Sequence, residues 1–192
     1  MTTGKPSRAQ RMLDIIDRLS RLARTGRQRD ELIPAQREAL SYLARANRFS
    51  RTPGALAQYL GTTKGTVSQT LIALERRGFL VKIANPNDAR SVQLDLTDEG
   101  RAVLFEAPVE TVARAMQSLS GPRRSEIDEA FTNLLTAMVA ETGGRPFGIC
   151  KSCRYFEAEG QHPKGGPHRC RLLDVGLSAA DAELICAEQQ AA

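Results

Sequence analysis

The apolar residues of the N-terminal segment recur every three or four positions, as they do along one face of a helix. They are Met12, Ile15, Ile16, Leu19 and Leu22. This spacing predicts an amphipathic helix over about residues 7–26.

Two further helices follow a loop. Pro34 suits the first turn of a helix, where its missing N–H is not needed, and an apolar face follows it. Thr52-Pro53 combines an N-cap with a first helical residue. The pattern predicts a second helix from Pro34 and a short third helix ending at Gly61.

A fourth helix is predicted directly after the third. Thr62 and Thr63 offer N-caps, and Gly78 ends the helical pattern. Its core stripe consists of Val67, Leu71 and Leu74.

The apolar period then changes from helical to alternating. Phe79, Val81 and Ile83 alternate with other residues, a polar Asn-Pro-Asn-Asp run follows, and alternation resumes at Val92, Leu94 and Leu96. Two alternating runs joined by turn-forming residues predict a β-hairpin with an exposed loop.

The remaining helices are marked by caps and breaks. Thr97 followed by two acids begins a helix, Pro108 should kink or break it, and Gly121-Pro122 is a second break. The helix beyond carries one apolar face and ends before Thr142-Gly143-Gly144. That face consists of Ile127, Phe131, Leu134, Leu135 and Met138.

This order of elements predicts a mainly α (α+β) fold with a winged helix-turn-helix core. Such a core places a helix in the major groove of DNA and a hairpin near an adjacent groove. The outward face and flank of the fourth helix then supply the contacts. The candidates are Lys64, Thr66, Ser68, Gln69 and Arg76.

These side chains differ in what they offer DNA. Gln69 is suited to pair with an adenine edge, and the small Gly65 and Thr66 permit close approach. Lys64, Ser68 and Arg76 are better suited to phosphates. The alternative is an ordinary solvated helix face, which the hairpin directly behind it disfavours.

Charge points to the same partner. Residues 1–90 carry 17 Lys/Arg against 7 Asp/Glu, whereas residues 91–144 carry 4 against 9. A basic half suggests a polyanion such as nucleic acid.

Residues 1–10 lack an apolar signal region, and no apolar run reaches the roughly 20 residues of a membrane span. We therefore expect a cytoplasmic protein without a membrane partner.

The segment GTTKGTVSQTLIALERRGFLVKIANPNDARSVQLDLTDEG resembles the MarR family of transcriptional regulators. The most specific part is NPNDARSVQLDLTDEG, which is similar to the family's wing. The resemblance spans roughly residues 8–142 and is strongest over about 34–104.

The resemblance implies roles for residues in and around the wing. By it, Asp88 braces the wing and Arg90 enters the minor groove, a placement that agrees with the attraction of narrow minor grooves for arginine. It also implies a homodimer that reads a pseudo-palindromic operator in double-stranded DNA. Many family members bind a small aromatic effector, but the chain has 5% aromatic residues and no Trp, so an aromatic-lined pocket is less expected here.

All four cysteines lie within the C-terminal segment, in the pattern C-x2-C-x16-C-x15-C. They are Cys150, Cys153, Cys170 and Cys186. Four thiolates match the count for tetrahedral zinc or an iron–sulfur cluster. The remaining alternatives are a redox disulfide pair and buried small side chains.

The choice between the two cofactors stays open. Only Cys150 and Cys153 form a close pair, which favours an iron–sulfur cluster over Zn²⁺ by a small margin, because structural zinc usually takes two close pairs. His162 and His168 are alternative ligands, although exposed loop histidines without a metal are the simpler interpretation.

The surroundings of the cysteines suit either cofactor. An apolar shell is expected around the sulfurs, formed by Phe147, Ile149, Tyr155, Phe156, Leu172, Leu173, Val175 and Leu177. Ser178 is expected to begin a last helix that carries Cys186.

The chain is therefore predicted to have two parts. Residues 1–144 form a MarR-like domain, with a DNA-binding lobe at about 34–97 and dimerisation helices at about 7–26 and 97–142. Residues 145–192 form a cysteine tail that binds metal or cluster. The predicted function is a homodimeric regulator, a repressor, and not an enzyme, because four cysteines would saturate a metal.

Two roles for the tail are open. In the first, loss or oxidation of the cofactor loosens the tail against the dimerisation helices and changes DNA affinity. In the second, the tail holds a purely structural zinc and a small molecule supplies the signal. A redox or metal enzyme and a non-specific DNA-binding protein are the less favoured classes.

Overall fold

The structure is a computed structural model that describes residues 6–24, 32–85, 88–104, 109–160, 162 and 165–191. It divides into two compact units. The first combines residues 1–31 with 105–130, and the second combines 32–104 with 131–192. The cysteine tail therefore shares a unit with the winged helix. No helix within the described ranges is long and apolar enough to cross a membrane.

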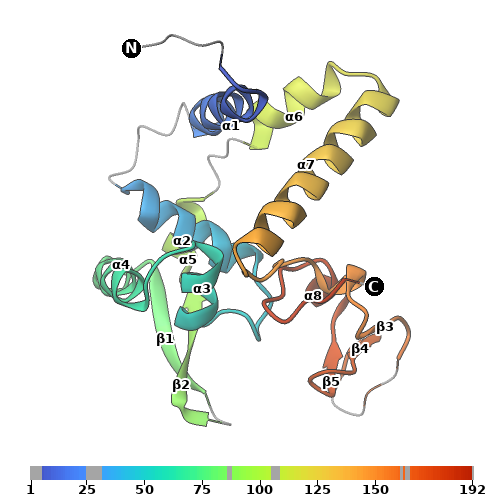
Figure 1. Ribbon diagram of the computed structural model, residues 1–192. Helices are drawn as coiled ribbons and strands as arrows, with labels where there is room; N and C mark the ends of the chain where they lie inside the picture. The colour runs from blue at the N-terminus through green and yellow to red at the C-terminus, as the bar shows by residue number, and fades with distance from the viewer. Residues whose placement is uncertain are drawn as a thin grey trace. The chain divides into compact units, whose positions relative to one another are not determined.

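The helices in and beside the DNA-binding lobe (Figure 1) begin where Pro34 and the threonine N-caps predict. They are α2 (Pro34–Arg45), α3 (Pro53–Tyr59), α4 (Lys64–Arg76) and α5 (Asp98–Ala102). The hydroxyls of Thr52, Thr63 and Thr97 each accept a backbone N–H at the start of the following helix. These caps satisfy donors that the helices themselves leave unpaired.

Two glycines are required by the backbone of this lobe. Gly61, in the turn between α3 and α4, has a φ of 59°, which favours glycine. Gly100 in α5 lies so close to the Phe79 carbonyl that an added Cβ would stand 1.9 Å from its oxygen. The close approach fixes α5 against the start of the hairpin.

The wing consists of β1 (Leu80–Asn85) and β2 (Asp88–Leu96), paired antiparallel. The predicted hairpin is confirmed, but the predicted phase of its first strand is wrong. Leu80, paired with Leu96, is buried, whereas Val81 and Ile83 are exposed. Lys82 lies on the same face as Leu80 and pairs with Glu75 of α4, so the core side of β1 carries one buried leucine and one salt bridge.

The helices outside this lobe are α1 (Arg8–Arg24), α6 (Val109–Gln117) and α7 (Gly121–Glu141). The predicted break at Gly121 and the end before Thr142 are confirmed; Pro108 lies outside the described residues. The apolar stripe of α1 is largely exposed within the chain, and so are Phe131, Leu135 and Met138 of α7.

The tail folds into a small sheet with short helical turns (Figure 1). Its elements are η1 (Cys150–Ser152), β3 (Phe156–Glu157), β4 (His168–Cys170), β5 (Val175–Leu177) and α8 (Ala179–Ala182). The strands are antiparallel in the order β3-β4-β5. Ser178 and Asp181 form a capping box for α8.

The last helix is shorter than predicted and does not carry Cys186. It ends at Ala182, because Ile185 leaves helical geometry to bridge Ala46 and Ile149. Cys186 follows this bridge and is buried.

Candidate functional site

Two groups of residues carry the candidate chemistry of the second unit. The first is the exposed face of α4. The second is a pocket formed by the cysteine tail.

The five candidate residues of α4 are all exposed, while Val67, Leu71 and Leu74 anchor the helix in the core. Gly65 faces open space, and the only atom near an added Cβ would be the Thr63 hydroxyl at 3.8 Å. Nothing in the lobe itself therefore requires glycine at this position. A DNA surface packed closely against the start of α4 would require a residue this small.

Thr66 is more constrained than its exposure suggests. Its backbone N–H donates to the Thr63 hydroxyl at 3.2 Å, and the two hydroxyls lie 3.0 Å apart. The Thr66 hydroxyl is thus part of the helix cap.

Asp88 and Arg90 belong to β2, but their side chains lie outside the described part of the structure. Their expected roles as a wing brace and a minor-groove contact stay predictions.

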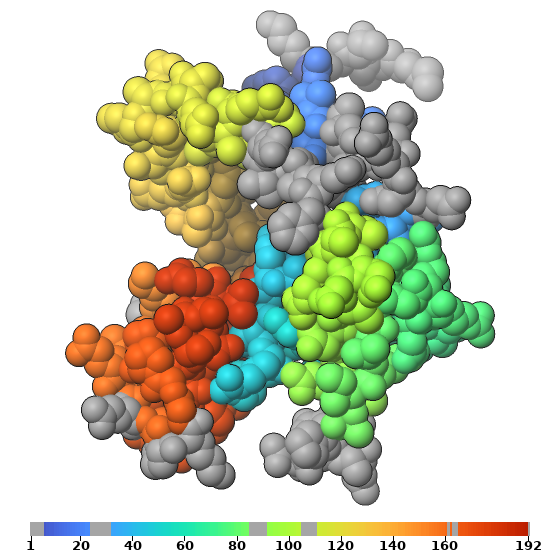
Figure 2. Space-filling view, turned by 180° about the vertical axis from the view of Figure 1, so that it is seen from behind, coloured from blue at the N-terminus to red at the C-terminus, as the bar shows by residue number. Residues whose placement is uncertain are grey.

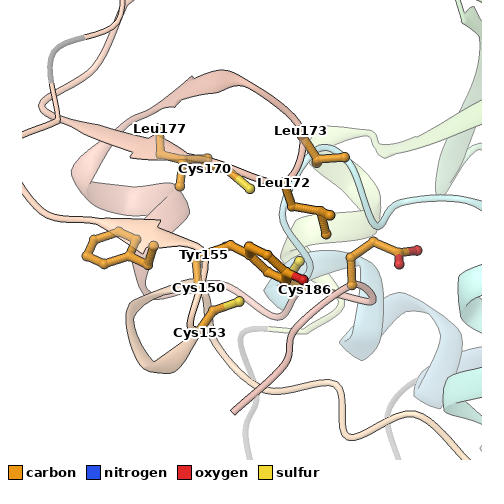
Figure 3. A pocket seen from close by; sticks show the side chains of 10 residues that line it. Cys150, Cys153, Tyr155, Cys170, Leu172, Leu173, Leu177 and Cys186 are labelled. Atoms are coloured by element: carbon orange, nitrogen blue, oxygen red, sulfur yellow. The ribbon is translucent and has the colours of Figure 1, made fainter. Parts of the chain in front are cut away.

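All four cysteines line one pocket (Figure 3). They arrive from different places: Cys150 and Cys153 from η1 and its end, Cys170 from β4, and Cys186 from the segment after α8. All four are free thiols. Tertiary folding has brought together residues that are up to 36 positions apart in the sequence.

The walls of the pocket are apolar. Tyr155, Phe156, Leu172, Leu173 and Leu177 complete the lining, together with Glu188. Five of the eight expected shell residues therefore line the pocket, whereas Phe147, Ile149 and Val175 do not. Phe147 instead packs edge-on against Tyr59 and Tyr42 of the DNA-binding lobe, with ring centroids 5.2 and 6.2 Å away.

Cys150 and Cys186 form a tightly coupled pair. Their hydrogen bond lowers the pKa of Cys186 to about 6 and holds the pKa of Cys150 above its ordinary value. Burial also raises the pKa of Cys150. Cys186 is therefore the thiol of this pair that ionises more readily.

The donor set fits a thiophilic metal or cluster, because soft sulfur ligands in an apolar wall are what zinc and iron–sulfur centres take. Among the described residues, no three His, Cys, Asp or Glu side chains are gathered into metal-binding geometry. The four thiols are potential ligands that surround a pocket, rather than a formed coordination sphere.

The two histidines take other positions. His168 in β4 is half-buried, its ring packs against Phe156 with centroids 5.0 Å apart, and its Nδ1 accepts the Glu159 N–H. His162 is mostly buried and lies 4.0 Å from Asp174. Neither lines the cysteine pocket, and the expectation of exposed loop histidines is wrong for both.

Sequence reasoning missed the residues that join the tail to the lobe. Asn47 is fully buried, and its Nδ2 donates to the sulfur of Cys150 at 3.3 Å. The Ser50 hydroxyl accepts the Ala187 N–H at 2.8 Å. Arg48 pairs with Asp181 at 3.0 Å. These residues occupy a short polar loop without periodicity, so no sequence signal marked them.

The fold and the exposed face of α4 define a winged helix-turn-helix protein. Residues 31–91 match the model of the MarR family, and the matched segment contains α2, α3, α4 and the start of the wing.

Relatives agree with this assignment. The chain is 35% identical over 85 residues to the uncharacterized HTH-type transcriptional regulator YkoM of Bacillus subtilis (strain 168), covering 41% of this chain and 55% of that protein. It is 46% identical over 41 residues to the HTH-type transcriptional regulator BilQ of Clostridioides difficile (strain CD3), covering 21% and 28%. The chain thus spans about half or less of these relatives, which are named as regulators rather than enzymes.

Among solved structures, the fold is similar to that of MepR from S. aureus in its DNA complex. The TM-score is 0.58 at 19% identity, and the match covers 69% of this chain and 96% of that chain. This likeness confirms the predicted fold class.

Proposed function

We propose that the chain is a sequence-specific DNA-binding transcriptional regulator that acts as a homodimeric repressor. The observation that carries this proposal is the exposed polar face of α4, held beside a two-stranded wing. A helix of this kind fits the major groove of DNA.

The proposed contacts follow from side-chain chemistry. Gln69 reads a base edge, and Lys64, Ser68 and Arg76 contact phosphates. Thr66 holds the start of α4 close to the DNA. Arg90 of the wing reaches a minor groove, with Asp88 bracing it, as the family resemblance implies.

The exposed apolar faces of α1 and α7 support the dimer. Leu13, Ile15, Leu19, Leu22, Phe131 and Leu135 are each at least 46% exposed in the single chain. Large apolar side chains exposed along a helix face support an interaction site on each helix. A two-fold dimer would read a pseudo-palindromic operator.

The four cysteines are proposed to hold an iron–sulfur cluster or Zn²⁺. The convergence of all four thiols on one apolar pocket supports this. Within the tail, the largest buried core is small and includes Cys150 and Cys186 themselves. Cofactor binding would therefore add directly to the folding free energy of the tail, and its loss would report redox or metal state.

The DNA-binding part of the proposal is tested with purified wild-type protein and DNA from upstream of its own gene. Binding is titrated with salt, in parallel with a shuffled duplex of equal composition. We expect specific binding about a thousandfold or more tighter than binding to the shuffled duplex. Equal affinity for both duplexes would contradict the regulator and indicate a non-specific DNA-binding protein.

A further inference from the structure

The cysteine pocket and the wing are joined by one short segment of the DNA-binding lobe, residues 46–51, named here the 46–51 turn. Figure 2 shows residues of this region, in cyan, between the red C-terminal tail and the green wing and α5. All of these belong to the second unit.

At the pocket end, the turn contacts Cys150 and the backbone beside Cys186. Asn47 donates to Cys150 at 3.3 Å, and the Ser50 hydroxyl accepts the N–H of Ala187, the residue after Cys186, at 2.8 Å. The backbone also pairs with the tail: Asn47 donates its N–H to Ile185, and Ile185 donates to Arg45, each at 2.8 Å.

The same asparagine shapes the turn. Its Oδ1 accepts the backbone N–H groups of Phe49 and Ser50 at 3.1 and 2.9 Å. Tyr42 then fixes the far side of the turn, donating its hydroxyl to the Ser50 carbonyl at 2.8 Å. Because one buried side chain serves both the sulfur and the backbone, a change in the sulfur bond reaches the turn directly.

At the wing end, the turn is bonded to β2. Leu94 donates its N–H to the Arg51 carbonyl at 2.7 Å, and Gln93 donates its side-chain amide to the Arg48 carbonyl at 3.0 Å. Arg51 also pairs with Asp95 at 2.9 Å. Gln93, Leu94 and Asp95 lie on β2, the strand that begins next to the wing tip.

We propose that Asn47 is a positioning residue that couples the state of the cysteine pocket to the wing through the 46–51 turn. The inference rests on the proposed function. An amide N–H is a hydrogen-bond donor, and it bonds a metal-bound sulfur more strongly than a neutral thiol. Loading the pocket therefore strengthens the Asn47–Cys150 bond, orders the turn and holds β2 in its DNA-binding position.

The test compares wild-type protein with the Asn47→Ser and Asn133→Ser variants. A serine hydroxyl still accepts turn N–H groups but lacks the amide donor to sulfur. Asn133 is exposed on α7 and provides the same substitution as a control. Metal-free, reduced protein is assayed for binding to DNA from upstream of its gene, with and without one equivalent of Zn²⁺, and bound zinc is counted.

We expect Zn²⁺ to tighten DNA binding about 10-fold in the wild type and in Asn133→Ser, a coupling of ordinary size. In Asn47→Ser, zinc should still bind at one per chain, while the gain in DNA affinity falls below about 2-fold. A full gain in Asn47→Ser overturns the coupling. So does zinc binding in the wild type without any change in DNA affinity.

A second measurement does not depend on the variant folding well. Hydrogen exchange in the wild type should slow in the 92–96 stretch of β2 when zinc is added, because the Leu94 N–H is bonded to the turn. Unchanged exchange there also overturns the coupling. Failure to bind zinc at all, or failure to prefer the upstream DNA, would instead overturn the proposed function on which the coupling rests.

Discussion

At the scale of single residues, Gln69 and Lys64 share the exposed side of α4 but differ in what they offer DNA. A glutamine amide carries both a donor and an acceptor and can match an adenine edge, whereas a lysine ammonium is a point charge suited to phosphate. Their substitutions should therefore fail in different ways.

Replacing Gln69 with alanine should weaken binding to the specific duplex by about 1–3 kcal/mol and leave shuffled DNA nearly unaffected. Lys64→Ala should weaken both and reduce the salt slope by about one. Salt-titrated binding isotherms measure both effects. Gln117→Ala, on the exposed surface of α6, is the matched control, and a uniform loss in Gln69→Ala would refute base readout by this residue.

At the scale of elements, the two faces of β1 differ in how much the core depends on them. Leu80 is 1% exposed and Leu94 is fully buried, while Val81 is 44% exposed. These two buried leucines, one on each strand, are therefore expected to carry much of the packing energy of the wing.

Leu80→Ala should lower the free energy of unfolding by about 2–5 kcal/mol through lost burial and a cavity. Val81→Ala, its neighbour on the other face, should cost less than about 1 kcal/mol. Urea denaturation of the two variants measures the difference. If Val81→Ala proved the more damaging, the assigned register of β1 would be incorrect.

Much at this scale could be predicted from sequence, because caps and breaks are local signals. Thr52, Thr63 and Thr97 each mark a helix start through one hydroxyl and one nearby N–H. The phase of β1 was not readable, because Val81 and Ile83 are apolar yet exposed, and the core-facing Lys82 is charged but paired.

The site was predictable in part. The cysteine spacing indicated that the four thiols gather, and the fold places them around one pocket. The contact between the cysteine tail and the DNA-binding lobe was not predictable. Asn47 and Cys150 lie 103 residues apart, and the short polar loop that contains Asn47 has no periodicity. Sequence reasoning therefore placed the coupling at the dimerisation helices and missed the direct contact.

At the scale of the whole molecule, large apolar side chains of α1 and α7 are exposed in the single chain. The partner proposed for them is a second copy of the chain, because a two-fold dimer of winged helices reads two half-sites. The tail adds a cysteine-lined pocket to the unit that contains the DNA-binding lobe.

Leu135, 59% exposed on α7, is the residue with which to test the dimer. Leu135→Asp should convert the protein to monomer and weaken operator binding, because a buried unpaired carboxylate is costly at an apolar interface. Sedimentation velocity measures the mass. Asn133→Asp on the same helix should leave the dimer intact, and a dimeric Leu135→Asp would place the interface elsewhere.

The central claim is that the four cysteines hold a cofactor, and one measurement tests it most directly. The wild type is purified without oxygen, and its visible spectrum, iron, acid-labile sulfide and zinc are determined on one sample, beside a Cys150→Ser/Cys186→Ser variant. We predict either a coloured protein with iron and sulfide or a colourless one with about one zinc per chain, lost in the variant. A wild type with neither iron nor zinc, which also fails to take up added Zn²⁺, would contradict the account.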